Sequence, residues 1–344
     1  MVDIAIIDSG INDFMKEKYK ERIIGGHSYA ATDKGIIKYD DYIDESNHGT
    51  SCTSYIYNKT PNCRFYLVKI LGKNGKGYGK ILIEALKDLM YSKIKIINMS
   101  ISTECIDIKN EMEIICEELY RQGKILIASN KNNSSTYSLP AAFSNVIGVE
   151  SKCFYGKDIY YFDDTRSIQC VADNMPEITE IGDNRYAFWG RNSKATAYIT
   201  SKVVEIIAEN NNEMSYLEIC KKLKEKAETN KEYQSFLKES TFIMQTDLFR
   251  KDLDKDDLYR EKVLYLESML IRFFRLDNEE KHHLHTCFFC KQIGFSTDVC
   301  MDLIEFLVNE LHVIIDYTKV SMLDFYNIDT LYYALFNKWQ KKYT

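Results

Sequence analysis

The chain has 344 residues, of which 45% are hydrophobic and 28% are charged, and its formal net charge is −6. This length allows two domains whose cores are stable without a disulfide or a metal ion. The negative net charge argues against a nucleic acid partner, because binding a phosphate backbone needs clustered Lys and Arg. No apolar stretch approaches the roughly 18 residues of a membrane-spanning helix, and the N-terminus lacks a signal-peptide pattern. We therefore expect a cytoplasmic globular protein without nucleic acid or membrane partners.

Gly and Pro divide the chain into two parts. Fourteen of the 15 Gly and all three Pro lie at or before residue 190. The first part is therefore predicted to be rich in turns and the second to be mostly helical. The ten Cys lack the dense spacing of a secreted disulfide scaffold, so we expect free thiols.

Five apolar runs in the first part predict buried β-strands. They are rich in Ile and Val and nearly continuous, which is typical of strands buried on both faces of a parallel sheet. The runs are residues 2–8, 64–71, 94–100, 124–129 and 145–151. Helical patterns at 80–93 and 110–123 lie between them, which predicts an α/β sandwich. Asp8, Ser100 and Asn130 stand at carboxyl ends of strands, where such sheets form their ligand crevice.

The remaining helical patterns predict how the second part is organised. Apolar residues recur at helical spacing in residues 194–208, 215–228, 259–274, 298–311 and 328–340. We therefore predict a first domain at 1–232, a charged connector at 233–254, and a small all-α domain at 255–344.

Several motifs in a fixed order identify a family. They are Asp-Ser-Gly at 8–10, His-Gly-Thr at 48–50, Asn-Met-Ser at 98–100, Ser-Asn at 129–130, LPAAFSNVIGVES at 139–151, and Ser193 at the mouth of a helix. Their order and contexts resemble the subtilisin-like serine peptidases, the subtilases, over roughly residues 2 to 229. The resemblance implies a three-layer α/β sandwich with a mainly parallel sheet.

The resemblance also implies the catalytic roles. A Ser hydroxyl is a weak nucleophile that needs an imidazole base, and the imidazole needs a carboxylate to fix its tautomer. Ser193, His48 and Asp8 would fill these roles, and Asn130 would stabilise the oxyanion together with the Ser193 backbone N–H. This chemistry requires no cofactor, while the resemblance allows structural calcium.

Substrate contacts follow from the same resemblance. An extended peptide would pair with Ser100, Ile101 and Ser102 beside Ala128 and Ser129. The loop 72–79 would form the other edge or would simply be a surface turn. Asp44 and Glu45 would attract basic substrate residues or form a solvated acidic loop, which is the reading we favour.

The chain departs from the family pattern near the nucleophile. Arg191, Asn192 and Lys194 surround Ser193 where Gly, Thr and Met are usual, and Ala197 replaces a Pro. Ser102 replaces a common Gly beside the first specificity pocket. The first strand begins at residue 2, so no pro-segment is expected.

The C-terminal segment resembles an acyl or peptidyl carrier protein. Ser296 aligns near the attachment Ser of that family but is displaced from the Asp-Ser-Leu motif, so we expect no phosphopantetheine there. A generic helical domain is the alternative. The stretch HHLHTCFFC at 282–290 contains His and Cys, the side chains that bind zinc in proteins. No second Cys-x-x-Cys follows it, so we expect a packed loop and no metal.

These patterns together predict an intracellular subtilisin-like serine endopeptidase. Its C-terminal domain would recruit a specific protein or peptide substrate. One alternative is a pseudo-peptidase that binds peptides without cleaving them, and another is a carrier-type module on a peptidase scaffold.

Overall fold

A computed structural model describes residues 1–132, 137–154, 158–210, 214–229, 257–293 and 295–340. These residues fall into two compact units. Segments 175–178 and 186–189 group with the described residues from 257 onward in the second unit, and the other described residues form the first. The predicted connector, residues 233–254, lies outside the described residues, because residues 230–256 are not described.

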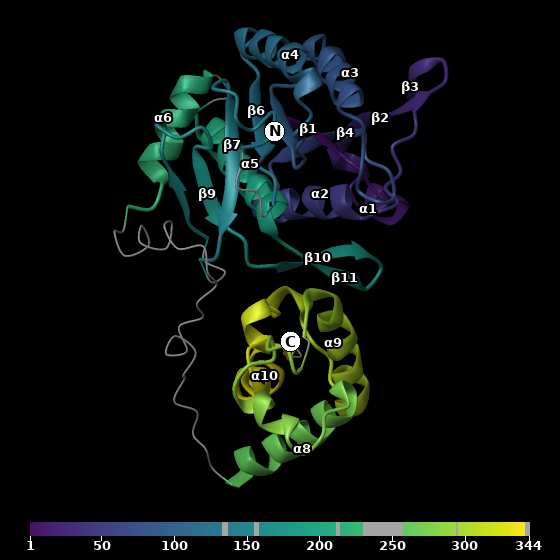
Figure 1. The fold of residues 1–344 in the computed structure, drawn as a ribbon, viewed down its shortest axis with the longest axis vertical. Coiled ribbons are helices and arrows are strands. Elements are labelled where there is room, and N and C mark those ends of the chain that lie inside the picture. Colours follow the sequence, from purple (N-terminus) through teal and green to yellow (C-terminus); the bar gives the residue numbers. More distant parts are fainter. Residues whose placement is uncertain (133–136, 155–157, 211–213, 230–256, 294, 341–344) are drawn as a thin grey trace. The chain divides into compact units, whose positions relative to one another are not determined.

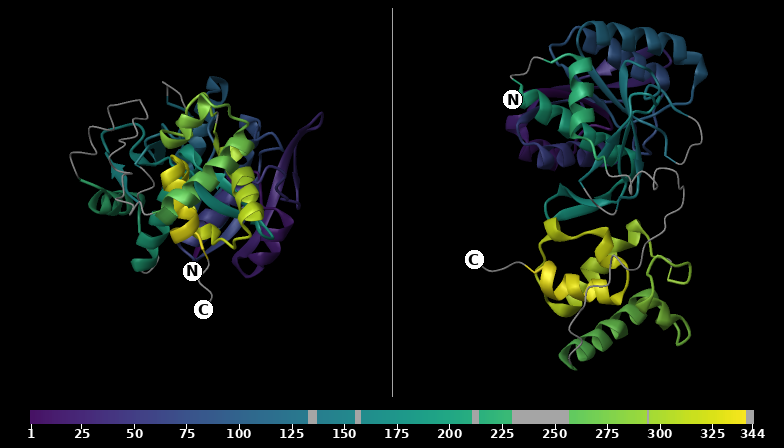
Figure 2. Two further views of the ribbon diagram at one scale, coloured as in Figure 1. Left: turned by 90° about the horizontal axis from the view of Figure 1, so that it is seen from below. Right: turned by 90° about the vertical axis from the view of Figure 1, so that its left-hand side faces the viewer.

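The first unit is built on one large sheet (Figure 1). Its strands are β1 (Val2–Asp8), β2 (Ile23–Thr32), β3 (Gly35–Tyr39), β4 (Cys63–Lys69), β5 (Ile96–Met99), β6 (Ile125–Ser129), β7 (Val146–Lys152), β8 (Tyr160–Phe162) and β9 (Cys170–Asp173). They lie in the order β3-β2-β4-β1-β5-β6-β7-β9-β8. Neighbours from β2 to β9 pair in parallel, while β3 and β8 pair antiparallel at the edges. The β2–β3 hairpin extends outward from the sheet in Figure 1 and in the left view of Figure 2.

Helices cover both faces of this sheet. They are α1 (Asp13–Lys18), α2 (His48–Lys59), α3 (Gly79–Met90), α4 (Lys109–Arg121), α5 (Arg191–Glu209) and α6 (Tyr216–Lys226), with 3₁₀ turns at Lys20–Arg22 and Ile106–Ile108. In Figure 1, α3 and α4 lie together on one side of the sheet, and α2 and α5 lie on the other. The arrangement is the predicted three-layer α/β sandwich.

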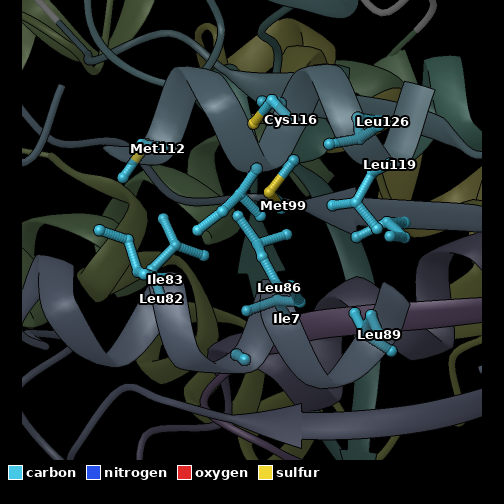
Figure 3. Packing of buried hydrophobic residues seen from close by; sticks show 14 of the residues in the cluster. Ile7, Leu82, Ile83, Leu86, Leu89, Met99, Met112, Cys116, Leu119 and Leu126 are labelled. Atoms are coloured by element: carbon cyan, nitrogen blue, oxygen red, sulfur yellow. The ribbon is translucent and has the colours of Figure 1, made fainter. Parts of the chain in front are cut away.

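Alternation along the strands decides which side chains form the core and which face the polar side. Successive residues of a strand point to opposite faces. Ile7 and Met99 are fully buried under α3 and α4, together with Leu86 and Leu119 from those helices (Figure 3). Asn98, next to Met99, instead accepts a hydrogen bond from Thr200 Oγ1 of α5 at 2.8 Å. The α2/α5 face therefore carries the polar chemistry, and the α3/α4 face carries the largest apolar cluster.

The second unit combines short strand segments with helices. The strands β10 (Glu177–Gly182) and β11 (Arg185–Trp189) form a hairpin, of which residues 177–178 and 186–189 group with the second unit and residues 179–185 with the first. The helices of the second unit are α8 (Asp257–Phe274), α9 (Thr297–Leu311) and α10 (Ile328–Tyr333), with 3₁₀ turns at Glu280–His285, Tyr317–Lys319 and Met322–Phe325 and a π-helical turn at Ala334–Lys338. Phe288, Phe325 and Trp339 are fully buried in this unit. Phe295 contacts the rings of Phe288 and Phe325 at centroid distances of 5.9 and 5.5 Å. The Cys-Phe-Phe-Cys stretch thus contributes to an aromatic core.

Comparison with the sequence prediction shows where the elements differ. The five predicted strands form, each within two residues of its expected bounds. The hairpins β2–β3 and β10–β11 and the strands β8 and β9 were not predicted. The helix that begins at His48 was not predicted either, and the expected helix at 328–340 changes to a π-helical turn at Ala334. None of the described helices is both long and apolar enough to cross a lipid bilayer.

Candidate active site

The carboxyl end of β1 places Asp8 next to the first residue of α2. Asp8 is fully buried, and its Oδ1 accepts hydrogen bonds from the Ser9 N–H at 2.7 Å and from His48 Nδ1 at 2.8 Å. Two glycines allow this approach, because a Cβ added to Gly49 would lie 2.4 Å from the carbonyl oxygen of Gly10. The Gly residues of the Asp-Ser-Gly and His-Gly motifs therefore let two backbone segments touch directly.

The loop before α2 fixes the position of His48. Asn47 has a φ of 61°, in the left-handed region that Asn tolerates better than most residues. Asp44 lies beneath this loop, and its Oδ1 accepts the N–H groups of Ser46 and Asn47 at 2.8 and 3.0 Å. Its Oδ2 accepts both the N–H and the Oγ1 of Thr50, at 2.9 and 2.8 Å. One carboxylate thus holds the loop and the first turn of the helix.

This role of Asp44 corrects the sequence interpretation. Asp44 is only 5% exposed and its oxygens are used within the protein, so it neither attracts a substrate nor forms a solvated loop. Glu45 is different, because its side chain is 57% exposed and pairs with Lys69 at 3.1 Å. The sequence signal that could have separated them is the position of Asp44 before a helix N-terminus, where carboxylates cap free N–H groups.

The imidazole of His48 bridges Asp8 and Ser193. Its Nδ1 lies 2.8 and 3.0 Å from the two oxygens of Asp8, and its Nε2 lies 3.0 Å from Ser193 Oγ. Because a carboxylate only accepts hydrogen bonds, Nδ1 carries the proton and Nε2 is left to accept one. The structure thus brings together three predicted residues that are separated in sequence by 40 and 145 positions.

The electrostatics of this site favour protonation of His48. Burial alone would lower the pKa of the imidazole, but the Asp8 carboxylate and, more weakly, that of Asp44 hold this pKa above its ordinary value. A base whose conjugate acid is stabilised in this way accepts a proton readily. The arrangement can therefore take a proton from the Ser193 hydroxyl as that oxygen attacks a carbonyl carbon.

Ser193 lies in the first turn of α5, where backbone N–H groups lack helical partners. The Arg191 N–H donates to Asn174 O at 3.1 Å, and the Asn192 N–H donates to Asn132 Oδ1 at 3.1 Å. Within the described residues, the Ser193 N–H has no hydrogen-bond acceptor. It is therefore available to a developing oxyanion, and the helix dipole adds to its effect.

Asn130 supplies the second candidate donor. It follows β6, is 4% exposed, and its Oδ1 accepts both the N–H and the Oγ of Ser138 at 3.0 Å. These two bonds fix which end of the amide is the oxygen. Its Nδ2 has no acceptor in the part of the chain that the structure describes. The Asn130 carbonyl also accepts Asn192 Nδ2 at 2.9 Å, which links it to the turn that carries Ser193.

A buried polar network behind Ser193 was missed by the sequence analysis. Ser100 Oγ donates to the Ser193 carbonyl at 3.3 Å and accepts from Asn98 Nδ2 at 3.2 Å. Cys52 Sγ of α2 lies 3.5 Å from the same hydroxyl. Burial raises the pKa of the Cys52 thiol, which keeps it neutral. The Ser100 side chain therefore faces the interior, and only its backbone remains for a substrate contact.

An open groove of about 620 Å³ begins at His48. Its walls are Ser46, Ile70, Leu71, Leu82, residues 73–79 and residues 100–103. Residues 100–102 from one predicted edge and residues 73–79 from the other thus line the same groove. Ala128 and Ser129 do not line it, and the Ala128 side chain is buried in the core against α3 and α4.

The remaining predicted positions lie in the second unit. Ser296 is exposed and is the N-cap residue of α9, although its side chain makes no capping hydrogen bond. Cys287 and Cys290 are free thiols. Among the residues that the structure describes, no three His, Cys, Asp or Glu side chains are grouped to hold a metal ion.

Comparisons with known proteins match the part of the chain that carries this candidate site. Residues 1–251 match the family model described as "Subtilase family". The chain is 25% identical over 221 residues to a thermophilic serine proteinase from Bacillus sp. (strain AK1), covering 61% of this chain and 53% of that protein. It is 21% identical over 217 residues to an intracellular serine protease from Paenibacillus polymyxa, covering 60% of this chain and 66% of the relative. The chain thus spans about half to two thirds of the length of these relatives.

A solved structure shares the fold. The crystal structure of a cold adapted subtilisin-like serine proteinase matches with a TM-score of 0.52 and 19% identity, covering 67% of this chain and 83% of that one. This confirms the predicted subtilisin-like α/β fold. The family match ends at residue 251, before α8, so the carrier-like resemblance stays a prediction.

Proposed function

Because this chain belongs to the subtilase family, we propose that it is a serine endopeptidase that cleaves peptide bonds through an acyl-enzyme on Ser193. The observation that carries the proposal is the position of His48, whose two ring nitrogens contact Asp8 and Ser193 at 2.8 and 3.0 Å. The names of the two curated relatives support the same activity.

The proposed reaction uses the triad twice. Ser193 Oγ attacks the scissile carbonyl carbon while His48 Nε2 takes the hydroxyl proton, and the Ser193 N–H and Asn130 Nδ2 bind the oxyanion. As the tetrahedral intermediate collapses, His48 donates its proton to the leaving amine. A water molecule, deprotonated by His48, then hydrolyses the ester and restores Ser193. These side chains supply nucleophile, base and oxyanion donors, so the proposed chemistry needs no cofactor.

The groove supports an extended peptide as the substrate. A strand-like peptide would pair through its main chain with residues 100–102 and meet the loop 72–79 on its other side. Main-chain pairing recognises any sequence, so restriction to one protein or peptide would have to come from elsewhere. We propose that the helical unit recruits the substrate partner, and that the enzyme acts inside the cell like the relative named intracellular serine protease.

A fluorophosphonate probe tests the activated nucleophile. We expect it to label the wild-type chain but not Ser193→Ala. Ser201→Ala is a matched control, since this buried Ser lies in the same helix and its Oγ donates to Tyr198 O at 2.7 Å. The Ser201→Ala control should be labelled like the wild type. When the wild type is incubated with peptides, mass spectrometry of the products should show cleavage at bonds inside the peptide chains. A folded wild type that neither labels nor cleaves would favour the pseudo-peptidase.

The helical unit needs separate tests. Recruitment predicts that removing residues 235–344 changes the captured partners or the cleavage pattern, and an unchanged result would contradict it. For Ser296, we expect no added mass on the intact protein after incubation with a phosphopantetheinyl transferase and coenzyme A. Modification of Ser296 would instead support the carrier alternative.

A further inference from the structure

The residue after the nucleophile is a buried lysine. Lys194 is 2% exposed, although Lys is almost never fully buried unless it is paired. Its Nζ lies 3.0 Å from Asp173 Oδ2, at the carboxyl end of β9, and the Asp173 side chain is 5% exposed. The other Asp173 oxygen accepts the Phe154 N–H at 2.7 Å.

This ion pair lies beside a second contact between the same segments. The Arg191 N–H donates to the carbonyl oxygen of Asn174, the residue after Asp173, at 3.1 Å. The end of β9 is therefore joined to the first turn of α5 on both sides of Ser193, through the backbone of residue 191 and the side chain of residue 194. Arg191 has a φ of 62°, in a region that favours Gly, so this turn is also locally strained.

Stability alone does not explain a buried ion pair here. Two apolar side chains of similar volume are often as stable as such a pair, because removing both charges from water is unfavourable. A charged pair with fixed hydrogen-bond geometry, however, restricts the turn to one arrangement. A positive charge in the first turn also opposes the helix dipole, which the Asp173 carboxylate offsets.

We propose that Lys194 and Asp173 are positioning residues that hold Ser193 Oγ and the Ser193 N–H in their reactive geometry. The inference rests on the proposed peptidase activity. Displacement of a reacting group by about 1 Å can lower a rate by about 100-fold. We therefore expect Lys194→Met to lower kcat by about 10- to 100-fold while KM changes by less than about threefold.

The test compares three variants with the wild type. They are the single variant Lys194→Met, the double variant that combines Lys194→Met and Asp173→Asn, and the control Lys124→Met. Lys124 is a matched control, because it is also buried (5% exposed) but lies before β6, away from the carboxyl ends, and donates to Ser92 O and Ile94 O at 2.7 and 2.9 Å. Lys124→Met should lower the melting temperature and leave kcat per titrated active site unchanged. The double variant removes both charges of the Lys194–Asp173 pair and can keep the Phe154 bond, so it should recover stability but not kcat.

Amide hydrogen exchange at residues 190–196 gives a readout that needs no activity. We expect faster exchange in this turn for Lys194→Met and for the double variant, but not for Lys124→Met. Recovery of both kcat and exchange protection in the double variant would overturn the proposal. If Lys194→Met does not fold, the double variant alone tests whether the ion pair holds the turn. If the wild type itself shows no hydrolysis, the proposed function fails, and the exchange result still decides whether the pair holds the turn.

Discussion

Asp44 accepts two hydrogen bonds from Thr50, one from its backbone N–H and one from its hydroxyl, in the helix that begins with His48. The same carboxylate also accepts the N–H groups of Ser46 and Asn47. The position of His48 therefore depends on an acidic residue that touches neither Asp8 nor Ser193.

We expect Asp44→Ala to lower both stability and activity. It leaves buried N–H groups without acceptors, at about 1–3 kcal/mol for each such group, and it releases the turn that carries His48. We predict a loss of at least about 2 kcal/mol in the free energy of unfolding and at least tenfold in kcat/KM. Glu45→Gln is the control, because an exposed ion pair contributes only about 0–1 kcal/mol. Denaturant unfolding and kcat/KM for both variants check this, and equal effects would contradict it.

The raised pKa of His48 predicts the acid limb of the pH profile. The base must be neutral to accept the Ser193 proton, so kcat/KM should fall as the pH drops below the folded pKa, which lies above the ordinary value of about 6.5. Asp8→Asn removes the main charge that raises this pKa. We therefore expect the limb to move to lower pH and the plateau to fall by about 10³- to 10⁴-fold. Profiles of kcat/KM for both proteins measure the shift, and a limb that stays in place would count against the Asp8 contribution.

Asn130→Ala tests the oxyanion site. Loss of a side-chain oxyanion donor in a subtilisin, a member of this same family, lowers kcat by about 10²- to 10³-fold, and we adopt that known range here. KM should change little, because the bond strengthens only in the transition state. Ser138→Ala should show a smaller loss in kcat, since the Ser138 N–H still holds Asn130 Oδ1 when the hydroxyl is removed. Steady-state kinetics would contradict this assignment if Asn130→Ala raised KM and left kcat unchanged.

The residues that sequence analysis found differ in kind from those it missed. Asp8, His48, Asn130 and Ser193 each stand in a motif whose neighbours also matter, such as the Gly residues that allow close backbone contact. Such local requirements restrict the neighbouring residues, so these four positions can be predicted from the sequence. The central strands can be predicted in the same way, because buried strands are continuous runs rich in Ile and Val.

The missed residues depend on contacts between distant segments. Thr200 and Asn98 are hydrogen-bonded across 102 positions, and no local pattern pairs them. Lys194 could be seen as unusual in sequence, but its partner Asp173 could not be identified. The β2–β3 hairpin is a different case, because its strands are partly exposed and lack the continuous apolar run that marked the central strands.

Asp324 is predicted to be the main polar support of the second unit. It is 8% exposed and accepts Trp339 Nε1, Lys338 Nζ and the Ser321 N–H at 2.8, 2.8 and 2.9 Å. Asp324→Ala leaves the Trp339 N–H buried without this acceptor, so we expect a loss of about 2–4 kcal/mol in the free energy of unfolding of this unit.

Both Trp residues of the chain belong to the second unit, so tryptophan fluorescence during denaturation follows its unfolding. Asp302→Ala, an exposed change in α9, should alter the free energy by less than about 0.5 kcal/mol. Fluorophosphonate labelling reports on the first unit in the same samples. If labelling is lost over the same denaturant range as the fluorescence change in Asp324→Ala, the two units unfold together. If labelling persists, the helical unit unfolds separately from the peptidase fold, and in either case an unshifted fluorescence midpoint would contradict the role of Asp324.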